Sequence, residues 1–176
     1  HTPGMRQLPP VLPSLLRVLV FALAVMACGA LTAATALPDL KPGQFTWAPE
    51  IAPSGPVTVV VSLPEQRAYV YRNGVRIGVS TVSSGRPGFD TPSGVYTILQ
   101  KRREHYSNLY DNAPMPFMQR LTWGGVALHA GALPGYPASH GCVRLPRAFA
   151  EKLFDVTSAG TVVVVASGAF PPTVVT

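Results

Sequence analysis

The sequence predicts a mainly β domain, and three observations indicate this fold class. Short runs rich in β-branched residues recur from residue 57 onward, and such residues are enriched in strands. The 176 residues include 19 prolines and 16 glycines, and an interior proline breaks a long helix. Hydrophobic residues make up 47% of the chain, so a fully disordered protein is excluded.

The predicted strands begin at Val57. Residues 57–63 (VTVVVSL) form a first short β-branched run, and two further runs flank Asn73-Gly74. An Asn-Gly pair favours a tight hairpin, because both central residues of a type I′ turn need positive φ. Further strands are predicted over residues 95–102, 116–123, 125–130 and 161–166, with a long loop over 103–116.

One helix is predicted near the end of the domain. Pro146 suits the first helical position. Phe149, Leu153 and Val156 recur at i, i+4 and i+7, which places them on one apolar face. Gly160 can end the helix before the last strand.

The first 36 residues predict an export signal. Arg6 and Arg17 are their only charged residues, and an uncharged apolar stretch follows and ends in Ala34-Thr35-Ala36. A positive start, an apolar middle and an A-x-A end are typical of a cleaved signal peptide. The uncharged run is also long enough to be retained as a membrane anchor, and residues 25–28 loosely resemble a lipoprotein box.

All of these interpretations predict delivery of the domain to the periplasm or to the outer face of the cytoplasmic membrane. We expect the leader over residues 1–36, a Pro-rich linker over 37–56, the domain over 57–167 and a tail over 168–176. The linker would tether the domain to the membrane if the leader is retained.

The charge and the cysteines narrow the class of protein. The net charge is +6, from 14 Lys and Arg against 8 Asp and Glu. This mild excess suits an anionic polymer or a membrane surface. No dense basic stripe is present, which argues against a nucleic-acid-binding protein. Removal of the leader would leave Cys142 as a single cysteine, which in an exported protein is a candidate reactive thiol.

The segment from Leu128 to Leu145 carries the candidate chemistry. A histidine near a cysteine can activate its thiol as a nucleophile. His129 ends a predicted strand, and His140 lies two residues before Cys142. The same three side chains could instead be buried structural residues or zinc ligands, although the paired spacing that is typical of zinc motifs is absent.

These residues also resemble a known family. The chain reads His129, a nine-residue gap, and then the run from Ser139 to Arg144, SHGCVR. This pattern resembles the signature of the L,D-transpeptidase catalytic domain, the YkuD family, and the resemblance extends over residues 57–166. It implies a twisted β-sandwich or barrel with one or two short helices, without a cofactor or metal.

The resemblance also implies the roles of the catalytic residues. Cys142 would be the nucleophile, and His129 would be the general base that takes its proton. The backbone carbonyl of Ala130 would orient the base.

The remaining site residues are implied as supporting groups. His140 and Gly141 would shape the oxyanion pocket, and Ser139 would fix the turn. Arg144 would either bind a substrate carboxylate or hold the loop. Met115 would contribute to substrate binding. The His-to-Cys gap is shorter than is usual in the family, so we expect an altered wall of the substrate cleft.

The implied function is that of a peptidoglycan L,D-transpeptidase. The thiolate would attack a tetrapeptide stem, release D-alanine through a thioester and form a 3–3 cross-link with a neighbouring stem. The alternatives on the same scaffold are an L,D-carboxypeptidase and the anchoring of a lipoprotein to the wall. From another class, the alternative is a non-catalytic wall-binding module. Carbapenem-type inhibitors would acylate Cys142.

Overall fold

The computed structural model describes residues 38–168. The predicted signal or anchor over residues 1–36 lies outside the described residues, as does nearly all of the predicted tail. Within residues 38–168, no helix has the length and apolar character needed to cross a membrane.

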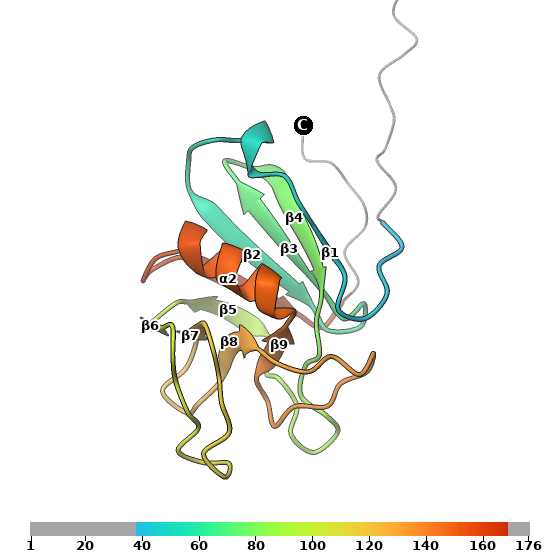
Figure 1. The fold of residues 1–176 in the computed structure, drawn as a ribbon, viewed down its shortest axis with the longest axis vertical. Coiled ribbons are helices and arrows are strands. Elements are labelled where there is room, and N and C mark those ends of the chain that lie inside the picture. Colours follow the sequence, from blue (N-terminus) through green and yellow to red (C-terminus); the bar gives the residue numbers. More distant parts are fainter. Residues whose placement is uncertain (1–37, 169–176) are drawn as a thin grey trace, which may run out of the picture. The chain divides into compact units, whose positions relative to one another are not determined.

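Two β-sheets and one α-helix build the domain (Figure 1). The larger sheet has the order β1-β4-β3-β2-β10-β5, and the smaller sheet has the order β6-β7-β8-β9. The main core contains buried residues from both sheets and from the helix. The predicted mainly β fold class is confirmed.

The larger sheet comprises β1 (Phe45–Trp47), β2 (Val57–Ser62), β3 (Arg67–Arg72), β4 (Val75–Thr81), β5 (Gly94–Thr97) and β10 (Val162–Ala166).

The smaller sheet carries the segment with the candidate chemistry. It comprises β6 (Gln100–Arg102), β7 (Met118–Arg120), β8 (Ala127–Ala130) and β9 (Val143–Leu145). In Figure 1 these strands lie below α2, and the larger sheet lies mostly above it. A short 3-10 helix, η1 (Pro49–Ile51), follows β1.

The predicted hairpin at Asn73-Gly74 is confirmed. β3 pairs with β4 in antiparallel register, with Arg72 opposite Val75. Asn73 and Gly74 have φ values of 50° and 77°, as a type I′ turn requires.

The predicted helix is α2 (Arg147–Val156), and it buries Phe149, Ala150 and Leu153. Pro146 takes the N-cap position, one residue before the first helical position predicted for it. The helix ends at Val156, before Gly160. After it, β10 runs parallel to β2 and completes the larger sheet.

The prediction of one strand over residues 95–102 is wrong. The chain forms β5 in the larger sheet and then β6 in the smaller one. The backbone N–H of Ile98 donates to Thr161, whereas the N–H of Leu99 donates to Arg120. At this change of sheets the side chain of Ile98 is buried in the core, whereas that of Leu99 is exposed.

Within the predicted linker over residues 37–56, the segment Phe45–Trp47 forms strand β1. This strand pairs with β4 at the edge of the larger sheet. The rings of Phe45 and Trp47 lie 5.4 and 5.5 Å from the ring of Phe149 in α2. Aromatic pairs at this separation add packing energy, so β1 belongs to the folded domain although its surroundings are rich in proline.

The position of β1 predicts that Trp47→Ala destabilises the domain. Loss of a half-buried ring against Phe149 is expected to lower the free energy of unfolding by about 2 kcal/mol. The matched control is Trp123→Ala, because Trp123 is 74% exposed and its loss should change stability by less than about 0.5 kcal/mol. Urea denaturation of residues 37–176 measures both values, and equal values would refute the packing role of β1.

Candidate active site

The smaller sheet presents different residues on its two faces, since successive side chains of a strand point to opposite sides. Leu128 and Leu145 belong to the main core. His129 and Arg144 are opposite each other in the β8–β9 register, and both line a cavity on the other face. The parallel pairing of β8 with β9 therefore aligns two predicted site residues.

Strand β9 begins at Val143, so Cys142 directly precedes it. Its pairing with β8 brings the Cys142 loop beside the strand that carries His129. The sequence analysis missed β9 because it has only three residues and follows a loop rich in Gly and Pro. The available signal for this strand was the alternation of apolar and polar side chains over Val143, Arg144 and Leu145.

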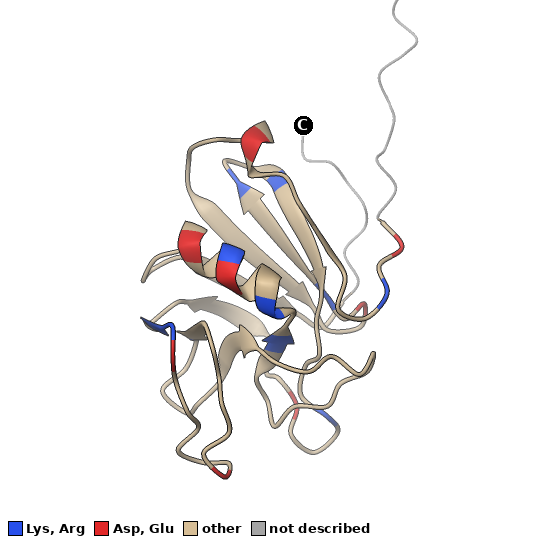
Figure 2. Ribbon diagram, viewed as in Figure 1, with Lys and Arg blue, Asp and Glu red and all other residues tan. Residues whose placement is uncertain are grey.

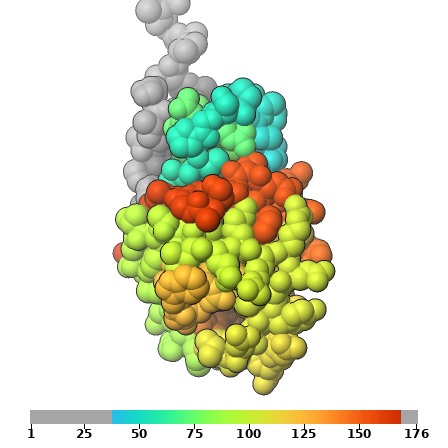
Figure 3. All heavy atoms as spheres, turned by 90° about the vertical axis from the view of Figure 1, so that its left-hand side faces the viewer, coloured from blue at the N-terminus to red at the C-terminus, as the bar shows by residue number. Residues whose placement is uncertain are grey.

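The cavity has a volume of about 740 Å³. Its walls come from the loop of residues 103–117, the turn between β7 and β8, and the loop that precedes β9. Figure 3 shows the surface hollowed between the first two of these segments. The predicted site residues that line the cavity are Met115, His129, Ala130, Ser139, His140, Cys142 and Arg144, whereas Gly141 is not part of the lining.

His129 is held in one orientation and one tautomer. Its Nδ1 lies 2.8 Å from the carbonyl oxygen of Ala130, as the family resemblance implied. A carbonyl oxygen can only accept, so Nδ1 carries the proton and Nε2 is left as a base. The pKa of His129 is lowered to about 4, mainly by burial and to a smaller extent by the charge of Arg144, against the opposing effect of the Ala130 carbonyl. The imidazole is therefore neutral at pH 7.

Cys142 has a free thiol and lines the cavity. Its Sγ donates to the carbonyl of Gly125 at 3.4 Å, and it packs against Met115 and Met118. Burial raises the pKa of the Cys142 thiol. A hydrogen bond from the backbone of Ala127 and the charges of nearby arginines lower this pKa but do not cancel the effect of burial. The resting site thus pairs a neutral thiol with a neutral imidazole.

The turn before Cys142 is fixed by two hydroxyl groups. Ser139 Oγ accepts from the Gly141 N–H at 3.1 Å and donates to the carbonyl of Cys142. Thr91 Oγ1 donates to the Gly141 carbonyl at 2.9 Å. Gly141 has a φ of +111°, a conformation that a side chain would strain. The sequence analysis had not assigned a role to Thr91.

These bonds bear on the role expected for Gly141. Its N–H donates to Ser139 Oγ and so holds the turn. The Cys142 N–H has no acceptor in the part of the chain that the structure describes. The oxyanion roles expected for these backbone groups stay predictions.

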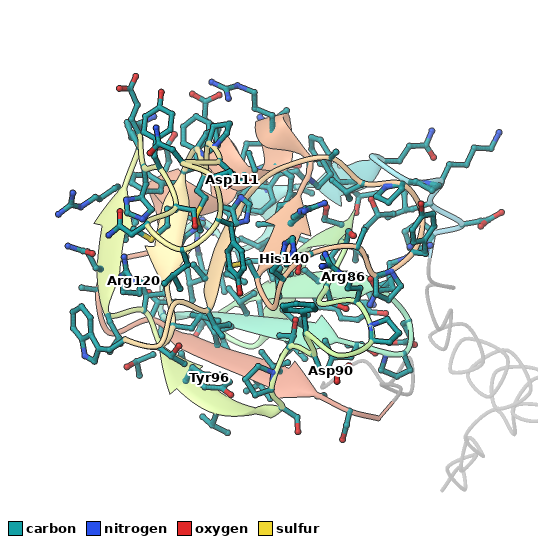
Figure 4. The ribbon with its side chains drawn as sticks, turned by 90° about the horizontal axis from the view of Figure 1, so that it is seen from below. Arg86, Asp90, Tyr96, Asp111, Arg120 and His140 are labelled. Carbon is teal, nitrogen blue, oxygen red and sulfur yellow. The ribbon has the colours of Figure 1, made fainter. Side chains whose placement is uncertain are left out.

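The side chain of His140 contacts aromatic rings from two other loops. Its ring stacks on Tyr110 at 4.4 Å and meets the edge of Phe89 at 4.9 Å. Arg86 lies 4.4 Å above the Phe89 ring. Figure 4 shows His140 between Arg86 on one side and Arg120 on the other. The side chain of His140 thus contacts the loops that surround the cavity, and the oxyanion role implied for His140 stays a prediction.

A zinc site receives no support from this arrangement. The Nδ1 atom of His129 is bound to Ala130, and the His140 ring is stacked between aromatic rings. Across residues 38–168, no three His, Cys, Asp or Glu side chains are grouped closely enough to hold a metal ion.

Comparisons with known proteins identify the family of the chain. The family model of the L,D-transpeptidase catalytic domain, YkuD, matches residues 56–165. The probable L,D-transpeptidase 3 of Mycobacterium tuberculosis is 32% identical over 107 residues, which covers 50% of this chain and 38% of that protein. The chain thus spans much less than two thirds of the length of this relative.

Solved structures share the fold. An L,D-transpeptidase from Stackebrandtia nassauensis is 31% identical with a TM-score of 0.59, and the match covers 67% of this chain and 58% of that chain. An L,D-transpeptidase solved in complex with imipenem is 25% identical with a TM-score of 0.58, covering 62% and 58% of the two chains. Since the family model matches more than half of the residues, the chain belongs to the YkuD family of L,D-transpeptidase catalytic domains.

Proposed function

We propose that this domain is a peptidoglycan L,D-transpeptidase in which Cys142 is the nucleophile and His129 the general base. The observation that carries the proposal is the hydrogen bond between His129 Nδ1 and the Ala130 carbonyl. It leaves Nε2 bare as a base in the cavity that also holds the free thiol. A buried histidine with a purely structural role would have no need to keep one ring nitrogen without a hydrogen bond in a cavity.

The first half of the reaction forms a thioester. His129 Nε2 takes the thiol proton as Sγ attacks the carbonyl of the third residue of a tetrapeptide stem. The negative charge that develops on the carbonyl oxygen is stabilised by the Cys142 N–H. The amide bond then breaks, and His129 returns its proton to the amine of D-alanine, which leaves.

The second half transfers the acyl group. The side-chain amine of a neighbouring stem attacks the thioester and loses a proton to His129. The C–S bond breaks, and the proton moves to the Cys142 sulfur, which restores the resting pair. The product is a 3–3 cross-link. If water attacks instead, the same steps give an L,D-carboxypeptidase, and a protein lysine as acceptor gives an anchored lipoprotein.

The substrate is found outside the cytoplasmic membrane, so the proposal includes export of the domain. The composition of residues 1–36 supports this location, either by a cleaved signal or by a retained anchor. The proposal also includes acylation of Cys142 by carbapenems, which is supported by the imipenem complex of a related L,D-transpeptidase.

The proposed function predicts a specific product pattern for residues 37–176 incubated with purified disaccharide-tetrapeptide. Mass spectrometry should detect a dimer that lacks one D-alanine. Cys142→Ala should abolish this product, and His129→Gln should lower kcat by about 10²- to 10⁴-fold because the general base is lost. The matched control is His105→Gln, which removes another histidine that lines the cavity and should change kcat less than about threefold.

Other outcomes of this assay have defined meanings. Tripeptide monomer as the sole product would indicate a carboxypeptidase. Turnover that survives in Cys142→Ala would refute the assigned nucleophile, and binding without turnover would favour a non-catalytic wall-binding module. Imipenem serves as a second probe, since its adduct should add mass to the wild-type protein but not to Cys142→Ala.

The neutral resting pair predicts how alkylation of Cys142 depends on pH. Since burial raises the pKa of the thiol, the thiolate fraction and the rate with iodoacetamide should rise about tenfold per pH unit and level off only at a higher pH than in a free cysteine. A cysteine peptide provides the reference. A rate that stays constant between about pH 5 and pH 8 would instead indicate a thiolate–imidazolium pair and contradict this account.

A further inference from the structure

The active-site cavity is basic. Arg120, Arg144 and Arg147 line it, and none of its described lining residues is Asp or Glu. In Figure 2 the acidic residues lie in α2, in η1 and in connecting segments. A cavity with several guanidinium groups and no carboxylate favours a substrate that carries negative charge.

Two of these arginines lie on opposite sides of strand β8. Arg120 in β7 is paired with Ala127, and Arg144 in β9 is paired with His129. Neighbouring strands are about 4.8 Å apart, so the backbones of β7 and β9 are separated by about 10 Å. Since Ala127 and His129 are two residues apart on one strand, their side chains share a face, and so do those of their partners Arg120 and Arg144.

The reacting groups lie at different levels along β8. The Cys142 sulfur is hydrogen-bonded to the Gly125 carbonyl and to the backbone of Ala127 at the start of β8, which is the level of Arg120. The base, His129, lies two residues further along β8 and is the register partner of Arg144. Along the strand, Arg120 is therefore level with the sulfur, and Arg144 is level with the base.

Arg120 is oriented by contacts with neighbouring side chains, but its two terminal nitrogens can still bind a ligand. Its Nε donates to Gln100 Oε1 at 3.2 Å, and its guanidinium lies 5.9 Å from the ring of Trp123. No carboxylate in residues 38–168 forms an ion pair with it. Its two terminal nitrogens are therefore available, and their planar geometry matches a carboxylate with two parallel hydrogen bonds.

We propose that Arg120 binds a free carboxylate on the side chain of the third residue of the stem, and so selects stems that carry this group. The inference rests on the proposed function. His129 protonates the amine of D-alanine, so D-alanine and its carboxylate lie at the level of Arg144. The acyl half of the substrate, with the side chain of the third residue, then lies at the level of Arg120. Amidation of that side-chain carboxylate removes the charge that Arg120 binds.

The test compares two stems that differ only in this group. Release of D-alanine is measured with disaccharide-tetrapeptides that contain diaminopimelate with either a free or an amidated side-chain carboxylate. The wild-type enzyme should prefer the free acid by about tenfold or more in kcat/KM, mainly through KM. Arg120→Gln should reduce this ratio to about one by weakening the acid stem alone, and Arg120→Lys should retain part of it.

The matched control is Arg102→Gln. Arg102 lies on the adjacent strand β6 but is exposed and does not line the cavity, so the preference should remain at the wild-type value. A wild-type enzyme without preference for the acid, or a preference that is unchanged in Arg120→Gln, would overturn the inference. Thermal denaturation of each variant confirms that the domain remains folded.

Measurements of binding affinity test the carboxylate site separately from the proposed function. The affinity of both stems is measured by calorimetry with Cys142→Ala, with and without Arg120→Gln. An Arg120-dependent preference for the acid stem supports the carboxylate site even if the wild-type protein releases no D-alanine, which would refute only the proposed function. Equal affinity for the two stems would refute the carboxylate site even if turnover occurs.

Discussion

The parallel pairing of β8 with β9 is the constraint on which the rest of the site depends. It places His129 opposite Arg144 and brings the residue before β9, Cys142, beside the strand that carries the base. The hydrogen bonds of Ser139 and Thr91 then fix the turn that carries the thiol. A shift of this register by one residue would turn His129 from the cavity into the core.

Burial determines the chemistry that this arrangement supports. It lowers the pKa of His129 and raises the pKa of Cys142, so both groups are neutral at rest. In the proposed reaction, proton transfer would then accompany attack on the substrate, in contrast to the behaviour of a preformed ion pair. The surrounding arginines stabilise the thiolate as it forms, and the absence of acidic groups from the described cavity lining suits a substrate with several carboxylates.

Local patterns in the sequence predicted much of the fold, and they singled out His129 and Cys142, which line the same cavity. The Asn73-Gly74 hairpin and the helix face of Phe149 and Leu153 depend on short-range rules. Strand β1 and the change of sheet at Ile98 were missed because both depend on distant partners. The role proposed for Arg120 depends on the β7–β8 register, which the sequence of a single strand does not contain.

The measurement that tests the central claim most directly is an NMR titration of the His129 ring nitrogens in residues 37–176. Long-range ¹⁵N–¹H spectra distinguish a protonated ring nitrogen from a bare one. The account predicts a neutral ring at pH 7 with its proton on Nδ1, and a midpoint at about 4. A proton on Nε2, or a midpoint near the ordinary value of about 6.5, would contradict the assignment of His129 as a buried, oriented base.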